Sequence, residues 1–297
     1  MNLFLAEWMK VNRNYKVVAF LVWIIPIGLT ALYLVLIGMA LIDDRASGGL
    51  DGVASGKWIQ DAVSVWNMVI FFPGNTVGRM LPLAFMAVVF AGEYEWRTWK
   101  NTVPRTNRYR LILVKLSVLV LVVVIGFSLA SLISGAANLF GRHITDVPYS
   151  PVFSPTSFGE FIFAFTKATA LGLLSIIYLG TLAALAAIIT RSILGALLVS
   201  YGLSLIDALS LGILALIKQL FNLPVELLNL YQLTPTYHIE NLWSWVFFDQ
   251  AATSLSGNLA IFTSAPSIAL SALIYGLWIM ALIAAAILLF QRQDLTS

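Results

Sequence analysis

The chain has 297 residues, of which 60% are hydrophobic and 10% are charged, and its formal net charge is +3. A soluble domain of this length cannot bury so much apolar surface, so the composition excludes an ordinary soluble globular protein and indicates a membrane protein. Cysteine is absent, which excludes disulfides and thiolate chemistry, and the two histidines, His143 and His238, are too far apart in sequence to indicate a His-based metal site.

The first segment, residues 1–16, predicts a short amphipathic helix that lies in the membrane interface. Leu3 and Trp8 share its apolar face, and Glu7 and Lys10 are expected to point toward water. The alternative is a plain charged lead-in to the first span. The charge-free run that follows is too long for the apolar region of a cleaved signal peptide. It predicts a membrane-spanning helix instead.

Six such runs predict an all-α membrane protein with six transmembrane helices. The second is ambiguous at its start, because Pro73 and Gly74 interrupt it. Either one kinked helix begins near residue 65, or an outer segment precedes a crossing that begins near residue 76, which is the reading we favour. The six predicted spans are residues 17–42, 70–91, 111–139, 158–190, 193–217 and 266–290.

The stretch before the last span, residues 218–265, is neither a clean span nor a plain loop. It mixes short apolar pieces with two prolines, Pro224 and Pro235, and with aromatic residues of the kind found at membrane interfaces. We expect short helices that lie at the outer face or dip into it, where protein or water must cover their backbone.

The distribution of basic residues predicts the orientation in the membrane. An even number of spans places both termini on one side, and Lys and Arg gather on the cytoplasmic side. The side that carries the termini holds Lys10, Arg13, Lys16, Arg97, Lys100, Arg105, Arg108, Arg110, Lys115, Arg191 and Arg292, and the other side holds Arg45, Lys57, Arg142 and Lys218. We therefore expect a multi-pass protein of the cell membrane with both termini and residues 92–110 in the cytoplasm.

The densest cluster of charge follows the second span. Glu93 and Glu95 precede Thr98, then come Pro104-Arg105 and a lysine, Lys115, that enters the third span. This order resembles the membrane subunits of ABC-2 type transporters. The six-span plan, the amphipathic start, the broken helices before the last span and the ending Phe290-Gln-Arg-Gln-Asp-Leu are similar to that family as well. Trp96-Arg97 departs from it, because the family more often has a glycine before the threonine.

The resemblance implies a permease that a separate cytoplasmic ABC ATPase drives, so the chain itself is not an enzyme. It implies a partnership with a second copy or a similar permease, contact with membrane lipids and none with nucleic acid, and export of a lipid, peptide or hydrophobic compound. ATP and Mg²⁺ would be bound by the ATPase, and no cofactor is expected here. The nearest string to a phosphate-binding loop, Gly52–Trp58, lacks its first glycine and its Ser/Thr.

We expect Glu93–Lys100 to form a short helix across the base of the second and third spans. Its aromatic residues are rigid anchors of the kind enriched at interface hot spots, and its charges would orient the partner. The alternative is a plain basic loop whose arginines bind lipid phosphates. The residues predicted to couple to the ATPase are Glu93, Tyr94, Glu95, Trp96, Arg97, Thr98, Trp99 and Arg105.

Charged residues within spans are costly and indicate a functional or structural role. Arg79 and Asp207 are expected at similar depths, about 20 Å and about 22 Å from the cytoplasmic ends of their helices, so an ion pair between them is plausible. It would be a staple between helices or a polar patch on the substrate path. Lys167 is expected to extend toward the surface. The rival functions are a non-transporting scaffold or immunity factor and a membrane-embedded enzyme, which would need paired catalytic groups at one depth.

Overall fold

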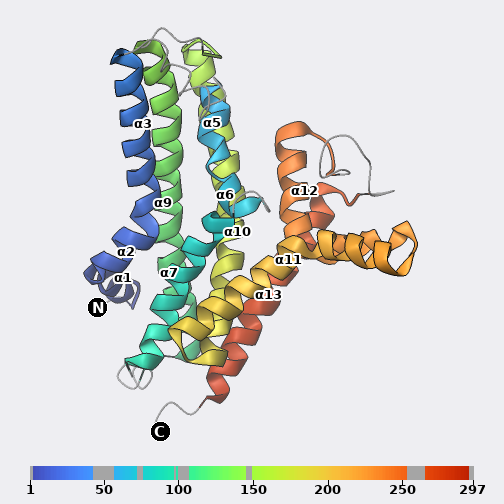
Figure 1. Cartoon of the computed structure of the whole chain (residues 1–297). Helices are drawn as coiled ribbons and strands as arrows, with labels where there is room; N and C mark the ends of the chain where they lie inside the picture. The colour runs from blue at the N-terminus through green and yellow to red at the C-terminus, as the bar shows by residue number, and fades with distance from the viewer. Residues whose placement is uncertain are drawn as a thin grey trace.

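The protein is a bundle of helices with a layer of tilted helices against one side (Figure 1). In the described residues, β structure is limited to one isolated bridge between Lys57 and Ser150, so the expected all-α fold class is confirmed. The computed structural model describes residues 3–42, 57–71, 76–96, 98–99, 107–144, 149–252 and 265–293.

The described helices follow one another along the chain. The amphipathic N-terminal segment and the first apolar run form one nearly continuous series of helical pieces, from α1 to α3. The helices are α1 (Leu3–Arg13), α2 (Tyr15–Val18), η1 (Ala19–Trp23), α3 (Ile24–Ile42), α5 (Trp58–Ser64), α6 (Asn67–Ile70), α7 (Thr76–Glu95), α9 (Arg108–Ile144), α10 (Pro155–Thr190), α11 (Ile193–Phe221), η4 (Val225–Leu233), α12 (Pro235–Phe248) and α13 (Ile268–Arg292).

Five helical stretches in the described residues are long and apolar enough to cross a membrane, namely Tyr15–Met39 and the helices α9, α10, α11 and α13. Together they indicate a multi-pass membrane protein. The span predicted at residues 70–91 is not among them. That part of the chain is divided between α6 and α7, and α7 carries Arg79 and Pro82 within its length. The predicted break at Pro73 and Gly74 lies outside the described residues.

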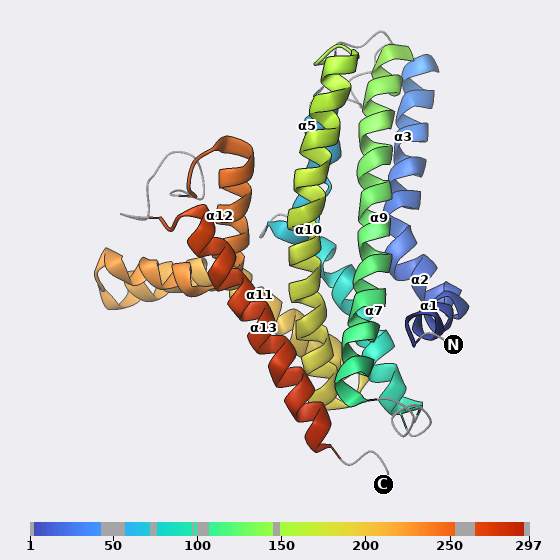
Figure 2. The same cartoon turned by 180° about the vertical axis from the view of Figure 1, so that it is seen from behind.

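The pieces α5, α6 and α7 lie one after another along the bundle. In both views α5 and α6 run beside one half of α9 and α10, and α7 runs beside the other half (Figures 1 and 2). The predicted second span, residues 70–91, thus corresponds to two separate helices, the end of α6 and most of α7, rather than to a single one. α1 and the end of α13 lie toward the same end of the molecule.

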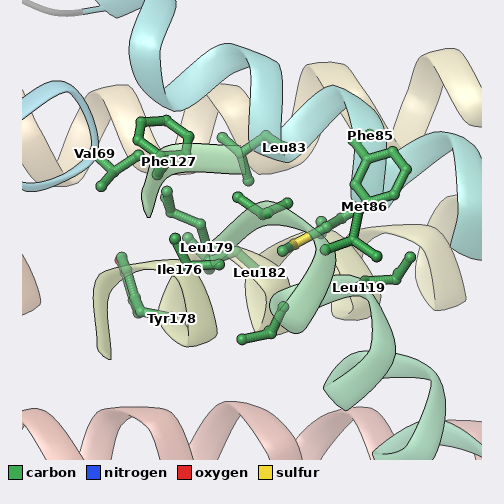
Figure 3. Packing of buried hydrophobic residues seen from close by; sticks show 14 of the residues in the cluster. Val69, Leu83, Phe85, Met86, Leu119, Phe127, Ile176, Tyr178, Leu179 and Leu182 are labelled. Atoms are coloured by element: carbon green, nitrogen blue, oxygen red, sulfur yellow. The ribbon is translucent and has the colours of Figure 1, made fainter. Parts of the chain in front are cut away.

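The core lies where α7, α9 and α10 meet. Fully buried apolar side chains from these three helices and from α6 interdigitate there (Figure 3). Such packing stabilises helices in lipid through close contact rather than through water exclusion. The labelled members are Val69, Leu83, Phe85, Met86, Leu119, Phe127, Ile176, Tyr178, Leu179 and Leu182.

One close approach in this core requires a glycine. Trp66, between α5 and α6, is fully buried, and its ring lies directly on the backbone of α10 at Gly172. A Cβ atom added to Gly172 would lie 2.0 Å from the Trp66 ring. The tryptophan can therefore pack here only because position 172 has no side chain.

The second layer begins at the turn between α10 and α11. Arg191 ends α10 in the left-handed conformation, at φ 54°, and α11 begins two residues later. α11 tilts away from the upright helices, and its far part extends with η4 to one side of the molecule (Figure 1). α12 then rises beside α13. The short helices predicted within residues 218–265 correspond to η4 and α12, while residues 253–264 lie outside the described part.

Candidate functional site

Four charged side chains from three helices meet at the end of α7. Glu93 of α7 accepts hydrogen bonds from Lys115 of α9 at 2.7 Å and from Lys10 of α1 at 3.2 Å. Glu7 of α1 binds Lys10 at 2.8 Å and lies 3.8 Å from the Lys115 ammonium. The two acids and two bases balance in charge. We call these four residues the charge cluster.

The charge cluster is largely removed from solvent. The side chains of Glu7 and Lys115 are each 2% exposed, and only Lys10 is substantially open at 39%. The prediction that Glu7 points toward water is therefore wrong. The helix α1 packs its acidic residue onto α9 because the Lys115 ammonium, buried there, needs negative partners.

The carboxyl of Glu93 stays ionised despite its burial. Burial is the largest single influence and raises the pKa of Glu93, but the Lys115 ammonium, the Thr98 hydroxyl and Lys10 together lower the pKa to about 2. For Lys10, burial lowers the pKa, yet the bonds to Glu7 and Glu93 raise it above its ordinary value. Glu93 and Lys10 are therefore both charged at neutral pH.

We expect this cluster to lose stability in acid. The pKa of Glu93 falls from 4.5 in the unfolded chain to about 2 in the fold, so its stabilisation, on the order of 3 kcal/mol, is complete above pH 4.5 and is lost as the pH falls toward 2. Thermal unfolding of the purified protein at a series of pH values measures this. Glu93→Gln should flatten the slope between pH 4.5 and 2, and an unchanged slope in that variant would contradict the assignment.

Two of the three predicted aromatic anchors point into the protein. Trp99 is only 4% exposed, and its ring lies 4.9 Å from Phe290 and 5.6 Å from Tyr94, measured between centroids. The Lys115 ammonium lies 5.1 Å from the centre of the same ring. The Tyr94 hydroxyl donates to the side chain of Gln293 at 2.8 Å. Tyr94 and Trp99 thus join the end of α7 to the end of α13.

Trp96 is the aromatic residue of this segment that faces outward. Its side chain is 57% exposed, and its ring folds back over Gly92, where an added Cβ atom would come within 2.9 Å. Glu93, Tyr94 and Glu95 belong to the last turn of α7, so they do not start the separate short helix that the sequence predicts. Trp96 therefore sits on the tip of a long helix.

Two further contacts fix neighbouring helix ends. The Glu95 carboxylate accepts the backbone N–H of Ile193, the first residue of α11, at 2.7 Å, where the positive end of the helix dipole favours an anion. Arg108 donates to the carbonyls of Phe290, Gln291 and Gln293 at 2.8–3.1 Å and so joins the start of α9 to the end of α13. Arg97 and Arg105, also predicted here, lie outside the described residues.

A second polar site surrounds Arg79 of α7. Its guanidinium donates to the carbonyls of Val69 at 3.2 Å and of Ile70, and to the hydroxyl of Thr236 at 3.3 Å. Val69 and Ile70 are the last two residues of α6, so their carbonyls have no partner within that helix. Arg79 therefore caps the broken end of α6, while it is itself only 3% exposed.

Asp207 of α11 contacts the same threonine, Thr236, as Arg79 does. Its carboxylate accepts the Thr236 hydroxyl at 2.7 Å and the Tyr178 hydroxyl at 3.0 Å. The sequence suggests a direct ion pair between Arg79 and Asp207, whereas the structure joins the two groups through Thr236, at the start of α12. The sequence did not mark Thr236, because nothing in a lone threonine signals a bridge between distant charges.

Lys167 is held by α12. Its ammonium donates to the carbonyl of Val246 at 3.0 Å and lies 4.2 Å from the centre of the Phe163 ring. This side chain links α10 to α12. The sequence predicts only that Lys167 extends toward the surface, not that it contacts another helix. The three charged residues predicted within spans thus all contact other helices.

In comparisons with known proteins, no family model and no curated protein matches this chain. A function for the two polar sites must therefore be argued from their own contacts.

Proposed function

We propose that the chain is the permease subunit of an ATP-driven transporter of the ABC-2 type, moved by a separate cytoplasmic ATPase that docks on Trp96. One observation carries the proposal. The last turn of α7 contacts the ends of several helices at once and leaves a large aromatic side chain exposed at its tip. Exposed aromatic residues on a rigid element are typical of interface hot spots.

The contacts of α7 provide a route by which a force on Trp96 reaches the bundle. Glu93 links α7 to α1 and α9, Tyr94 links it to α13 through Gln293, and Glu95 links it to α11. Gln293 also donates to the carbonyl of Ile188, near the end of α10, at 2.7 Å. A displacement of this turn therefore acts on five helices through short polar contacts.

The proposal also specifies how the chain crosses the membrane. The broken series α5 to α7 supplies the sixth crossing, the termini and the end of α7 face the cytoplasm of a cell membrane, and a second copy or a similar permease completes the path. ATP hydrolysis belongs to the partner, and the cargo exported is a lipid, peptide or hydrophobic compound. The resemblance of residues 93–115 to the ABC-2 family supports this reading.

We expect Trp96→Ala to uncouple the ATPase without unfolding the permease. Truncating a hot-spot aromatic typically costs on the order of 2 kcal/mol or more of binding, so permease-dependent ATP hydrolysis should fall by more than about tenfold. A photo-reactive phenylalanine at position 96 identifies the partner by cross-linking in native membranes. Hydrolysis by the co-purified complex then measures the coupling.

Phe140 offers a matched control. It is 60% exposed, close to the 57% of Trp96, but it lies near the opposite end of α9. Phe140→Ala should leave hydrolysis unchanged. The proposal fails if the residue at position 96 cross-links to no ATPase, or if the Trp96→Ala complex hydrolyses ATP at the rate of the unaltered protein.

A further inference from the structure

A cavity of about 410 Å³ lies between α12 and the wall formed by α5, α6 and α10. Figures 1 and 2 show α12 standing beside this wall. The volume falls within the range of about 300–1,000 Å³ that is typical of pockets for small ligands. Neither the charge cluster nor the site around Arg79 contributes a side chain to it, so the cavity is separate from both.

Polar side chains line one edge of the cavity at helical spacing. Gln60, Ser64 and Asn67 of α5 and α6 follow one another at intervals of four and three residues, the spacing of one helical face, and Lys57 precedes them at the start of α5. At the helical rise, this edge is about 15 Å long. It begins with a cation and continues with two amides and a hydroxyl.

The opposite wall is aromatic. Trp243, Phe247 and Phe248 of α12 line it, with the rings of Trp243 and Phe247 only 4.3 Å apart between centroids. The rings of Phe71 and Trp243 pack edge to face with their centroids 5.6 Å apart, which fixes the orientation of the tryptophan ring. A rigid wall of this kind receives a flat apolar surface with little loss of side-chain entropy.

The polar edge has an unused hydrogen-bonding group. In the described part of the chain, the amide oxygen of Asn67 is buried and has no hydrogen-bond partner. A buried polar group without a partner is costly, and a ligand hydroxyl at this place would satisfy it. Lys57 is the one charged residue in the described lining.

We propose that this cavity binds an anionic, facially amphipathic molecule. Such a ligand has hydroxyl groups along one edge, a flat apolar face and an anionic end. The anionic end lies at Lys57, the hydroxyls follow the polar edge to Asn67, and the apolar face lies on Trp243 and Phe247. The inference holds whether or not the chain couples to an ATPase.

The absence of cysteine from the chain makes a direct test possible. Ser64→Cys places one thiol on the polar edge, and Gly159→Cys places one in open space at the start of α10, at a residue that does not line the cavity. Each variant is reconstituted in phosphatidylcholine nanodiscs. The rate of reaction with N-ethylmaleimide is then measured with and without cholate, an anion with hydroxyls on one face, and with laurate, an anion that has no such edge.

Cholate is expected to slow the labelling of Ser64→Cys at least about tenfold and to leave Gly159→Cys unchanged, whereas laurate protects far less. Adding Lys57→Gln or Asn67→Leu to Ser64→Cys should weaken the protection by cholate about tenfold each. Equal protection by laurate would reduce the cavity to a plain apolar pocket and overturn the proposal. So would a labelling rate that cholate does not change, or protection that survives both substitutions.

Discussion

Replacing Glu93 by leucine is expected to lower the free energy of unfolding by about 3–5 kcal/mol, because it strands a buried cation. The Lys115 side chain is 2% exposed and would keep only Glu7, 3.8 Å away, as a negative partner. The same change removes the bond between Lys10 and α7. α1 should therefore loosen from the bundle as well, which hydrogen exchange in residues 3–13 would detect.

A double substitution separates the charge effect from the loss of packing. In Glu93→Leu with Lys115→Met, neither buried charge of the pair remains, so most of the lost stability should return. Lys10→Ala removes the more exposed cation of the same cluster, and because Glu7 and Glu93 both keep Lys115 nearby, it should cost less than Glu93→Leu. Thermal unfolding of the four proteins in one detergent gives the comparison. If the double variant is no more stable than Glu93→Leu alone, the pairing of Glu93 with Lys115 is not what stabilises this end of the bundle.

The sequence predicts the long helices well because charge-free apolar runs leave few alternatives. Residues 158–190, for example, correspond to α10, which begins at Pro155 and ends at Thr190. The second span is the exception. Its apolar run contains Arg79, whose favourable partners are carbonyls on α6 and a hydroxyl on α12. A sequence window records the charge of such a residue but not the distant groups that compensate it.

The aromatic residues predicted to couple to an ATPase show a similar limit. Sequence marks Tyr94, Trp96 and Trp99 alike as possible anchors, since all three are large aromatics beside charges. Only the fold determines that Tyr94 and Trp99 pack on α13 while Trp96 stays exposed. In the same way, the amphipathic pattern of α1 cannot show that a buried lysine on α9, Lys115, draws Glu7 inward, because that contact spans more than a hundred residues.

Arg79→Ala is expected to be the most damaging single change at the second polar site. It would leave the carbonyl of Ile70 without its donor and the carbonyl of Val69 with the Ser175 hydroxyl alone, and it would remove the cation that faces Asp207 through Thr236. Unsatisfied carbonyls each cost about 1–3 kcal/mol, and a stranded buried charge costs more. We expect a loss on the order of 4 kcal/mol or greater, seen as a lower thermal midpoint and a lower yield of folded protein.

The geometry also predicts which substitutions cannot restore this site. Arg79→Lys keeps the charge but lacks the planar fork that reaches the two α6 carbonyls and Thr236 together, so it should recover only part of the stability. Exchanging the charges, with Arg79→Asp and Asp207→Arg, should not rescue, because an arginine on α11 no longer caps α6. Thr236→Val keeps the shape of the bridge and removes its hydroxyl, at a cost of about 1–3 kcal/mol. Full rescue by the exchanged pair would show that a direct ion pair, and not the capping of α6, holds α6, α7, α11 and α12 together.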